Sequence, residues 1–305
     1  MRKRLSLAAI ALCLPLAAIA LCLPLAPTPA AADGAIPFTA TTSLWHETLS
    51  TLDEDAQGIA ALPFEKPRLT AKILGGIGVM ILLDRPLTRT YQNTVEKAFS
   101  GFALPKLPWE AKLTQLGLAS EDVWMLSGIA GSYAYGALTG DMRSQRAALL
   151  ASKALVYSFA TTQIVLKSAF GRKRPCPDLD VQGCSDGVYT DNPFDFGHYH
   201  GISVTPDGYG TSMPSYHFTQ YFAVARVYSG VYGDSWLPYG VASLLAVSNI
   251  RGHHHWVSDM VAGSVLGLGI GQVVLRNSDA YQAGTLTAAP LINHSGTGLS
   301  LDISF

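Results

Sequence analysis

Five uncharged stretches, separated by polar segments, constrain the fold of this chain more than any other feature. They are residues 73–83, 123–140, 154–166, 236–250 and 260–275. A helix that spans a bilayer needs about 20 mostly apolar residues, and most of these stretches are shorter. Several also contain Ser, Thr, Gln, Asn or clustered Gly. They fit the buried helices of a soluble bundle better than membrane spans, with an integral membrane protein as the alternative.

The rest of the pattern predicts an all-α domain. We expect helices over 69–83, 88–102, 120–138, 147–170, 214–228, 237–250 and 256–275. Ser120, followed by two acidic residues, is predicted to cap one helix, and Asp141 to cap the next. The sequence shows no series of strands and no alternation of strands with helices, so a helical bundle is the expected core.

Three other segments lack helix signals. Residues 33–68 are interrupted by proline, and we expect irregular structure there. Residues 176–213 are rich in Gly, Pro, Asp and Tyr and predict a long loop, which inside a compact domain is usually functional. The tail at 284–305 alternates around the turn-like run NHSGTG and predicts a β-hairpin.

The N-terminus has the layout of a secretory signal peptide. Arg2, Lys3 and Arg4 precede an apolar run over 5–26, and the alanines at 30–32 offer an A-x-A cleavage site. The predicted organisation is therefore a signal peptide at 1–32, a helical domain at 33–283 and a tail at 284–305. We expect an exported, periplasmic protein; an uncleaved N-terminal anchor is the alternative.

The cysteines agree with export. Two of the four lie inside the apolar leader, which leaves Cys176 and Cys184 in the mature chain. In an exported protein such a close pair predicts a local disulfide, with two free thiols as the alternative. Two sulfurs without further ligand spacing do not predict a metal site.

The charge balance argues against one class of partner. The chain has 21 Lys and Arg against 22 Asp and Glu, for a net charge of -1 at pH 7. Nucleic-acid binding relies on a positive surface that neutralises phosphates. We therefore expect no nucleic-acid partner.

Three segments carry side chains suited to phosphate chemistry. Lys167 and Arg174 are seven residues apart, which on one helix would place both on the same face, where two cations suit an anion. In Met213-Pro-Ser-Tyr-His217, a helix start would offer backbone N–H groups, a hydroxyl and a proton donor. Each segment alone also fits a structural interpretation, as a solvated helix end or an ordinary capped helix start.

The third segment runs from Ser248 to Asp259 and contains three consecutive histidines. On a helix, Asp259 could hold one nitrogen of His255 and leave the other free to attack. Two alternatives are a metal site formed by the histidines and a purely structural His255–Asp259 hydrogen bond.

In their order and spacing the three segments resemble the type 2 phosphatidic acid phosphatase superfamily, which includes the vanadium haloperoxidases. The family pattern is K-x(6)-R-P, then P-S-G-H, then S-R-x(5)-H-x(3)-D. The matching positions are Lys167, Arg174, Pro175, Pro214, Ser215, His217, Ser248, His255 and Asp259. The resemblance covers roughly residues 120–275. Tyr216 stands where the family usually has Gly, and Asn249 where it has Arg.

The resemblance implies a helical bundle in which the segments converge on one phosphate. His255 would be the nucleophile and form a phosphohistidine, Asp259 would orient it, and His217 would protonate the leaving oxygen. The phosphoryl oxygens would be held by Lys167, Arg174, Ser215 and the backbone N–H of Tyr216. No metal or other cofactor is expected, because the protein cations take that role; vanadate is expected as an inhibitor.

The two departures leave alternatives open. Arg251 could replace the cation missing at position 249, or it could point elsewhere. We expect a phosphatase acting on phosphate monoesters or pyrophosphates, of a soluble or a lipid substrate, with a membrane surface as a further contact. The alternatives are a non-catalytic phosphate-binding relative and a peroxidase with vanadate as prosthetic group. The sequence is silent on the leaving group and the oligomeric state.

Overall fold

The computed structural model describes residues 39–115, 117–181, 183–199, 210–248, 250, 254–278, 285–293 and 296–304. The predicted signal peptide lies outside these residues. The helical elements are α2 Thr39–Ser50, α3 Leu52–Glu65, α4 Pro67–Tyr91, the π-helical η1 Gln92–Glu96, α5 Lys97–Phe99, α6 Glu110–Thr114, α7 Ser120–Thr139, α8 Met142–Phe159, the π-helical η2 Ala160–Leu166, α9 Lys167–Phe170, α10 Tyr216–Val231, α11 Leu237–Val247 and α13 Val257–Arg276. The strands are β1 Arg174–Pro175, β2 Tyr189–Thr190, β3 Thr285–Asn293 and β4 Gly296–Ser304.

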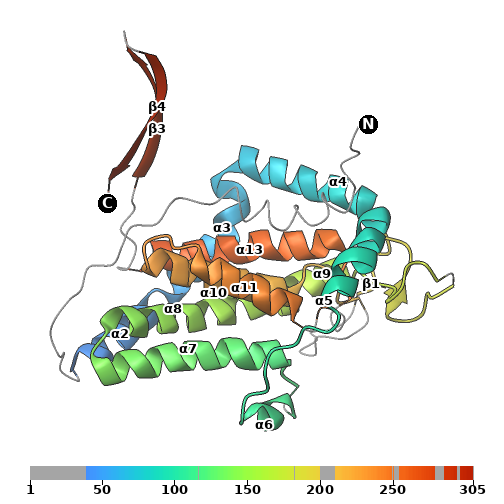
Figure 1. Ribbon diagram of the computed structural model, residues 1–305, viewed down its shortest axis with the longest axis horizontal. Coiled ribbons are helices and arrows are strands. Elements are labelled where there is room, and N and C mark those ends of the chain that lie inside the picture. The colour runs from blue at the N-terminus through green and yellow to red at the C-terminus, as the bar shows by residue number, and fades with distance from the viewer. Residues whose placement is uncertain are drawn as a thin grey trace.

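The predicted all-α bundle is confirmed. Helix α10 packs along α13, α8 and α11, while α7 packs against α8, and α4 lies across α13 on one side of the bundle (Figure 1). The main core combines Val227 and Tyr221 of α10 with Ile270 and Val274 of α13 and Leu150 of α8. The predicted C-terminal hairpin is also confirmed, with β3 and β4 antiparallel and paired from Thr285↔Ser304 to Asn293↔Gly296.

Small residues let α13 approach α10 closely. A Cβ at Gly267 would lie 2.2 Å from the Thr219 carbonyl oxygen, and one at Gly263 would lie 2.4 Å from the Ser215 carbonyl oxygen. Glycine is the residue that permits such close contact between backbones. The contact places the N-terminus of α10 beside that of α13, where the second and third sequence segments lie.

The expectation of irregular structure over 33–68 was wrong for the described residues from Thr39. Helices α2 and α3 occupy this region, and Pro63 lies in the last turn of α3. Tertiary contacts stabilise them: Lys153 of α8 forms a buried ion pair with Asp55 at 2.6 Å and donates to the Thr48 carbonyl oxygen at 3.0 Å. A buried charge of this kind is stable only when paired, and its partners are set by the fold.

Two local helix predictions were also wrong. The separate helices expected at 69–83 and 88–102 form one continuous helical segment, because α4 passes through Pro86 into η1 and α5. Ser120 begins α7 rather than capping it; its hydroxyl donates to Glu110 at 3.0 Å. Asp141, by contrast, caps α8 as predicted, accepting the Arg143 N–H at 3.0 Å.

The predicted loop after Pro175 is confirmed in its described parts, and it contains the predicted disulfide. Cys176 and Cys184 are bonded, with their Cα atoms 6.0 Å apart. Cys176 and Leu179 pack against Trp256, and Gln92 anchors the loop by donating to the Cys176 carbonyl oxygen at 2.8 Å. The disulfide loop therefore covers the residue that follows His255.

Two described helical segments, Met142–Phe170 and Val257–Arg276, are long and apolar enough to cross a membrane. In their most apolar windows, 44% and 61% of the residues are buried inside the bundle. Buried core helices of soluble proteins have the same length and composition.

Candidate active site

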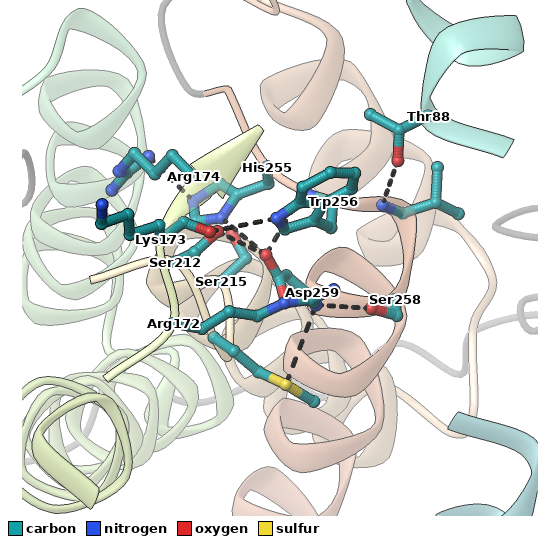
Figure 2. Close-up of polar contacts among 12 residues, drawn as sticks. Thr88, Arg172, Lys173, Arg174, Ser212, Ser215, His255, Trp256, Ser258 and Asp259 are labelled. Atoms are coloured by element: carbon teal, nitrogen blue, oxygen red, sulfur yellow. Dashed lines mark hydrogen bonds and ion pairs between the residues drawn. The ribbon is translucent and has the colours of Figure 1, made fainter. Parts of the chain in front are cut away.

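The His255 ring lies between a cation and a carboxylate (Figure 2). Its Nε2 is 3.5 Å from Arg174 Nη1, and its Nδ1 is 3.7 Å from Asp259 Oδ2. The second distance is longer than a hydrogen bond, so in this state the two groups are in electrostatic contact. His255 is 5% exposed and Asp259 is fully buried. Nδ1 of His255 thus faces the Asp259 carboxylate, and Nε2 faces the Arg174 guanidinium.

The expected helical spacing of this pair was wrong. Helix α13 begins at Val257, so His255 precedes it and Asp259 lies in its first turn. Asp259 also accepts the Trp256 backbone N–H at 3.2 Å, and the Trp256 indole donates to the Lys173 carbonyl oxygen at 3.0 Å. The contact between His255 and Asp259 therefore results from the turn that starts the helix.

Arg172 holds Asp259 from the other side. Its Nη1 donates to Asp259 Oδ1 at 2.6 Å, and its Nη2 donates to Asp84 Oδ2 of α4 at 2.8 Å. All three side chains are fully buried. The Arg172 guanidinium also lies over the Trp256 ring, 5.2 Å from its centre. Ser212 donates to the remaining oxygen of Asp259, Oδ2, at 2.5 Å, so the carboxylate that faces His255 is fixed on both oxygens.

Helix α4 supplies partners for the first turn of α13. The Ser258 N–H donates to Asp84 Oδ1 at 3.0 Å, and the Val257 N–H donates to Thr88 Oγ1 at 3.2 Å. The first N–H groups of a helix have no partner within it, so side chains from elsewhere must satisfy them. Residues from the apolar α4 thereby fix the start of the helix that carries Asp259.

The second segment meets the third through the backbone. The Ser215 N–H donates to the Asp259 carbonyl oxygen at 3.0 Å. Ser215 is the N-cap of α10 and is fully buried, and its Oγ has no hydrogen-bond partner among the described residues. A buried hydroxyl of this kind costs free energy unless a ligand or water satisfies it. Pro214 precedes the N-cap of α10, so its predicted place in the first helical turn was wrong by two positions.

Tyr216 does not obstruct this site. Its ring packs edge-on against Phe159 of α8, with the ring centres 5.8 Å apart. Burial, with the nearby Asp122 charge, raises the pKa of its hydroxyl. Its backbone N–H stays at the N-terminus of α10, where a helix favours an anion.

The predicted shared helical face of Lys167 and Arg174 was wrong. Helix α9 ends at Phe170, and Gly171 takes the left-handed conformation, with φ 53°. Arg174 is therefore on β1, in an extended segment. Both side chains are buried, at 2% and 3% exposure, and both act electrostatically on His255. Both cations still act on His255, although the helix ends at the left-handed Gly171 between them.

These surroundings set the protonation of the pair. Burial and then Arg174 lower the pKa of His255 well below its usual 6.5. Burial alone would raise the pKa of Asp259, but Arg172, His255 and Ser212 together outweigh burial and lower that pKa. For Asp84, burial prevails over Arg172 and raises the pKa. At neutral pH His255 is a neutral imidazole, whose unprotonated nitrogen can act as a nucleophile.

The structure brings together Lys167, Arg174, Ser215, His255 and Asp259 from the predicted set. His217 is the second residue of α10 and lies beside Asp122 of α7. Arg251 and Asn249 lie outside the described residues. In the described part of the chain, no group of three or more His, Cys, Asp or Glu side chains is arranged to hold a metal ion.

Sequence reasoning missed Arg172, Asp84 and Ser212. The only signal for Asp84 is a lone carboxylate at the end of the uncharged stretch 73–83. Arg172 lies in the first segment, but it is followed by Lys173 and Arg174. Nothing in the sequence showed that Arg172, and not one of the other two, would pair with Asp259.

Comparison with known proteins bears on this arrangement. A sequence model of the PAP2 superfamily matches residues 147–282. Residues 147–282 thus match the superfamily that the three segments resemble. Members of the PAP2 superfamily are generally phosphatases, and the matched segment contains Lys167, His217, His255 and Asp259. No curated protein and no solved structure matches the chain significantly.

The Asp84–Arg172–Asp259 network predicts the effect of removing one carboxylate. Asp84→Asn leaves Arg172 with a single charged partner inside the protein and weakens the cap on α13. Breaking a buried ion pair costs about 3–5 kcal/mol, and an amide recovers part of it, so we expect a loss of about 2–4 kcal/mol in the free energy of unfolding. Urea denaturation measures this loss.

Asp180→Asn is the matched control. Asp180 forms an exposed ion pair with Arg89, which lies on α4 as Asp84 does. Exposed ion pairs contribute about 0–1 kcal/mol, so this variant should unfold almost like wild type. Equal unfolding free energies for the two variants would contradict the role given to Asp84.

The lowered pKa of His255 predicts how stability depends on pH. Below about pH 6.5 an unfolded histidine binds a proton, whereas buried His255 does not, so falling pH favours the unfolded state. From pH 7.5 to 5.5, wild type should therefore lose about 1 kcal/mol more stability than His255→Gln. Parallel losses in urea denaturation at the two pH values would mean that His255 titrates normally.

Proposed function

We propose that the protein is an exported, metal-independent phosphatase that hydrolyses phosphate monoesters or pyrophosphates through a phosphohistidine. One observation carries the proposal: neutral His255 has Asp259 at Nδ1 and Arg174 at Nε2. A nucleophilic histidine needs one nitrogen held by an orienting group and the other directed at phosphorus. The cation beside Nε2 is where the negative phosphoryl group would bind.

In the first step, the lone pair of His255 Nε2 attacks phosphorus while the bond from phosphorus to the leaving oxygen breaks. The leaving oxygen takes that electron pair and a proton from His217, the general acid. In the second step, water attacks the phosphohistidine, gives up a proton to His217, and the P–N bond breaks. Inorganic phosphate leaves, and both histidines return to their starting states.

Side chains hold the phosphoryl oxygens throughout. Lys167 and Arg174 supply positive charge, and the buried Ser215 hydroxyl supplies a hydrogen bond together with the Tyr216 N–H. Fixed donors that meet growing negative charge are usually the largest contribution to this type of catalysis. Arg251 is proposed as a further cation in place of the arginine that the family has at 249.

Export and substrate class rest on other features. The leader sequence and the Cys176–Cys184 disulfide support secretion into an oxidising compartment such as the periplasm.

Helix α4 has an apolar surface that bears on the substrate class. Its Leu74, Val79 and Leu82 side chains are each more than half exposed. An exposed apolar face suits contact with a membrane surface, which favours a lipid phosphate among the substrates.

The alternatives explain less of the site. A phosphate-binding protein without catalysis needs cations, but it does not need a neutral His255 oriented by a buried carboxylate. A peroxidase would use the same residues to hold vanadate, which resembles phosphate in charge and shape. Vanadate is therefore proposed as a competitive inhibitor.

The nucleophile predicts a sharp mutational contrast. His255→Ala should lower kcat for p-nitrophenyl phosphate at least about 1,000-fold, because no other group forms the covalent intermediate. His254→Asn is the matched control: His254 is the adjacent histidine, and Asn tolerates its positive φ of 38°. It should keep kcat within a few-fold of wild type. Phosphate release measures both, and an active His255→Ala enzyme would refute the phosphohistidine.

A further inference from the structure

A carboxylate from α7 contacts the proposed general acid. Asp122 Oδ2 lies 3.5 Å from His217 Nε2, and both side chains are almost completely buried. Asp122 is in the first turn of α7, far from the three phosphate segments in sequence. The contact joins the helix that carries His217 to a helix with no other role in the site.

A second residue of α10 fixes this carboxylate. The Gln220 side-chain amide donates to Asp122 Oδ1, so the two oxygens of Asp122 face two different residues of α10. His217 and Gln220 are three residues apart and lie on the same side of the helix. Gln220 is 2% exposed, so Asp122 cannot turn away without leaving a buried amide unsatisfied.

We propose that Asp122 is a positioning residue for His217, a role that rests on the proposed phosphatase function. The carboxylate accepts the N–H on the Nε2 edge of the ring and fixes how the ring is turned. The proton for the leaving oxygen then comes from the opposite edge. Asp122 itself neither gains nor loses a proton in the reaction, and it touches no reacting atom.

A structural explanation makes a different prediction. Acidic residues in the first turn of a helix stabilise it through the helix dipole, and Glu121 and Asp122 both occupy that turn of α7. In that case replacing Asp122 would change stability and lower the rate for every substrate alike. A positioning role instead affects only reactions whose leaving group needs a proton.

The experiment compares two esters in the full-length mature protein. p-Nitrophenolate leaves without protonation, whereas the alkoxide of an alkyl phosphate needs the general acid. Asp122→Asn should lower kcat for the alkyl phosphate about tenfold or more and change kcat for p-nitrophenyl phosphate less than about threefold. Glu121→Gln, which removes the neighbouring buried carboxylate, should leave the ratio of the two kcat values unchanged.

A double variant separates positioning from a second, independent effect. If Asp122 acts only through His217, then Asp122→Asn combined with His217→Ala should be no slower on the alkyl ester than His217→Ala alone. If the double variant loses kcat by the product of the two single losses, the proposal is overturned. It is also overturned if Asp122→Asn lowers kcat equally for both esters. If Asp122→Asn fails to fold, Gln220→Met is the second variant, and it should shift the ratio in the same direction; an unchanged ratio would overturn the proposal.

The outcomes also distinguish this inference from the proposed function. Wild-type enzyme that hydrolyses both esters, with an unchanged ratio in Asp122→Asn, refutes the role of Asp122 alone. Wild-type enzyme that hydrolyses neither ester removes the proposed function, and the inference with it.

Discussion

The buried guanidinium of Arg172 is the interaction on which the arrangement of the site depends. It carries a full charge with no access to water, and Asp84 and Asp259 compensate it from two different helices. Charges in such a position are tolerated only when they are paired and fully hydrogen-bonded. Because Asp259 in turn faces His255, the same ion pairs that offset the cost of burial also help to determine where the His255 ring lies.

Close backbone packing adds the second constraint. Glycines of α13 bring α10 against it, and the Ser215 N–H bonds directly to the Asp259 carbonyl oxygen. A side chain at either helix contact would separate the two N-termini. The proposed phosphate site thus lies where two helices begin together, with the first N–H groups of α10 and the cations of the first segment available to an anion.

The sequence predicted which residues come together better than how the backbone brings them together. Lys167 and Arg174 both act electrostatically on His255, and Ser215 and His255 both contact Asp259, as the order of the three segments led us to expect. The sequence did not predict the backbone that positions them: Arg174 follows the left-handed Gly171 that ends α9, and His255 precedes α13. Both pairs were expected on helices, because spacings of seven and four residues match the helical repeat.

The supporting residues were hidden for a different reason. Asp84 and Ser258 are 174 residues apart in sequence, and no periodicity links positions so distant. The same holds for Asp55 and Lys153. Their ion pair links α3, which lies where irregular structure was expected, to α8. Bundle class and core helices follow from apolar periodicity, whereas buried ion pairs between distant segments exist only once the fold has formed.

The central claim is that His255 carries the phosphoryl group during turnover. Wild-type enzyme, quenched in base during steady-state turnover of a phosphate ester and digested, should yield a phosphorylated peptide whose label maps by mass spectrometry to His255. The linkage should be stable in base and labile in acid, as expected for a phosphorus–nitrogen bond. A label on another residue, or an active enzyme with no label under conditions where breakdown of the intermediate limits the rate, would contradict the account.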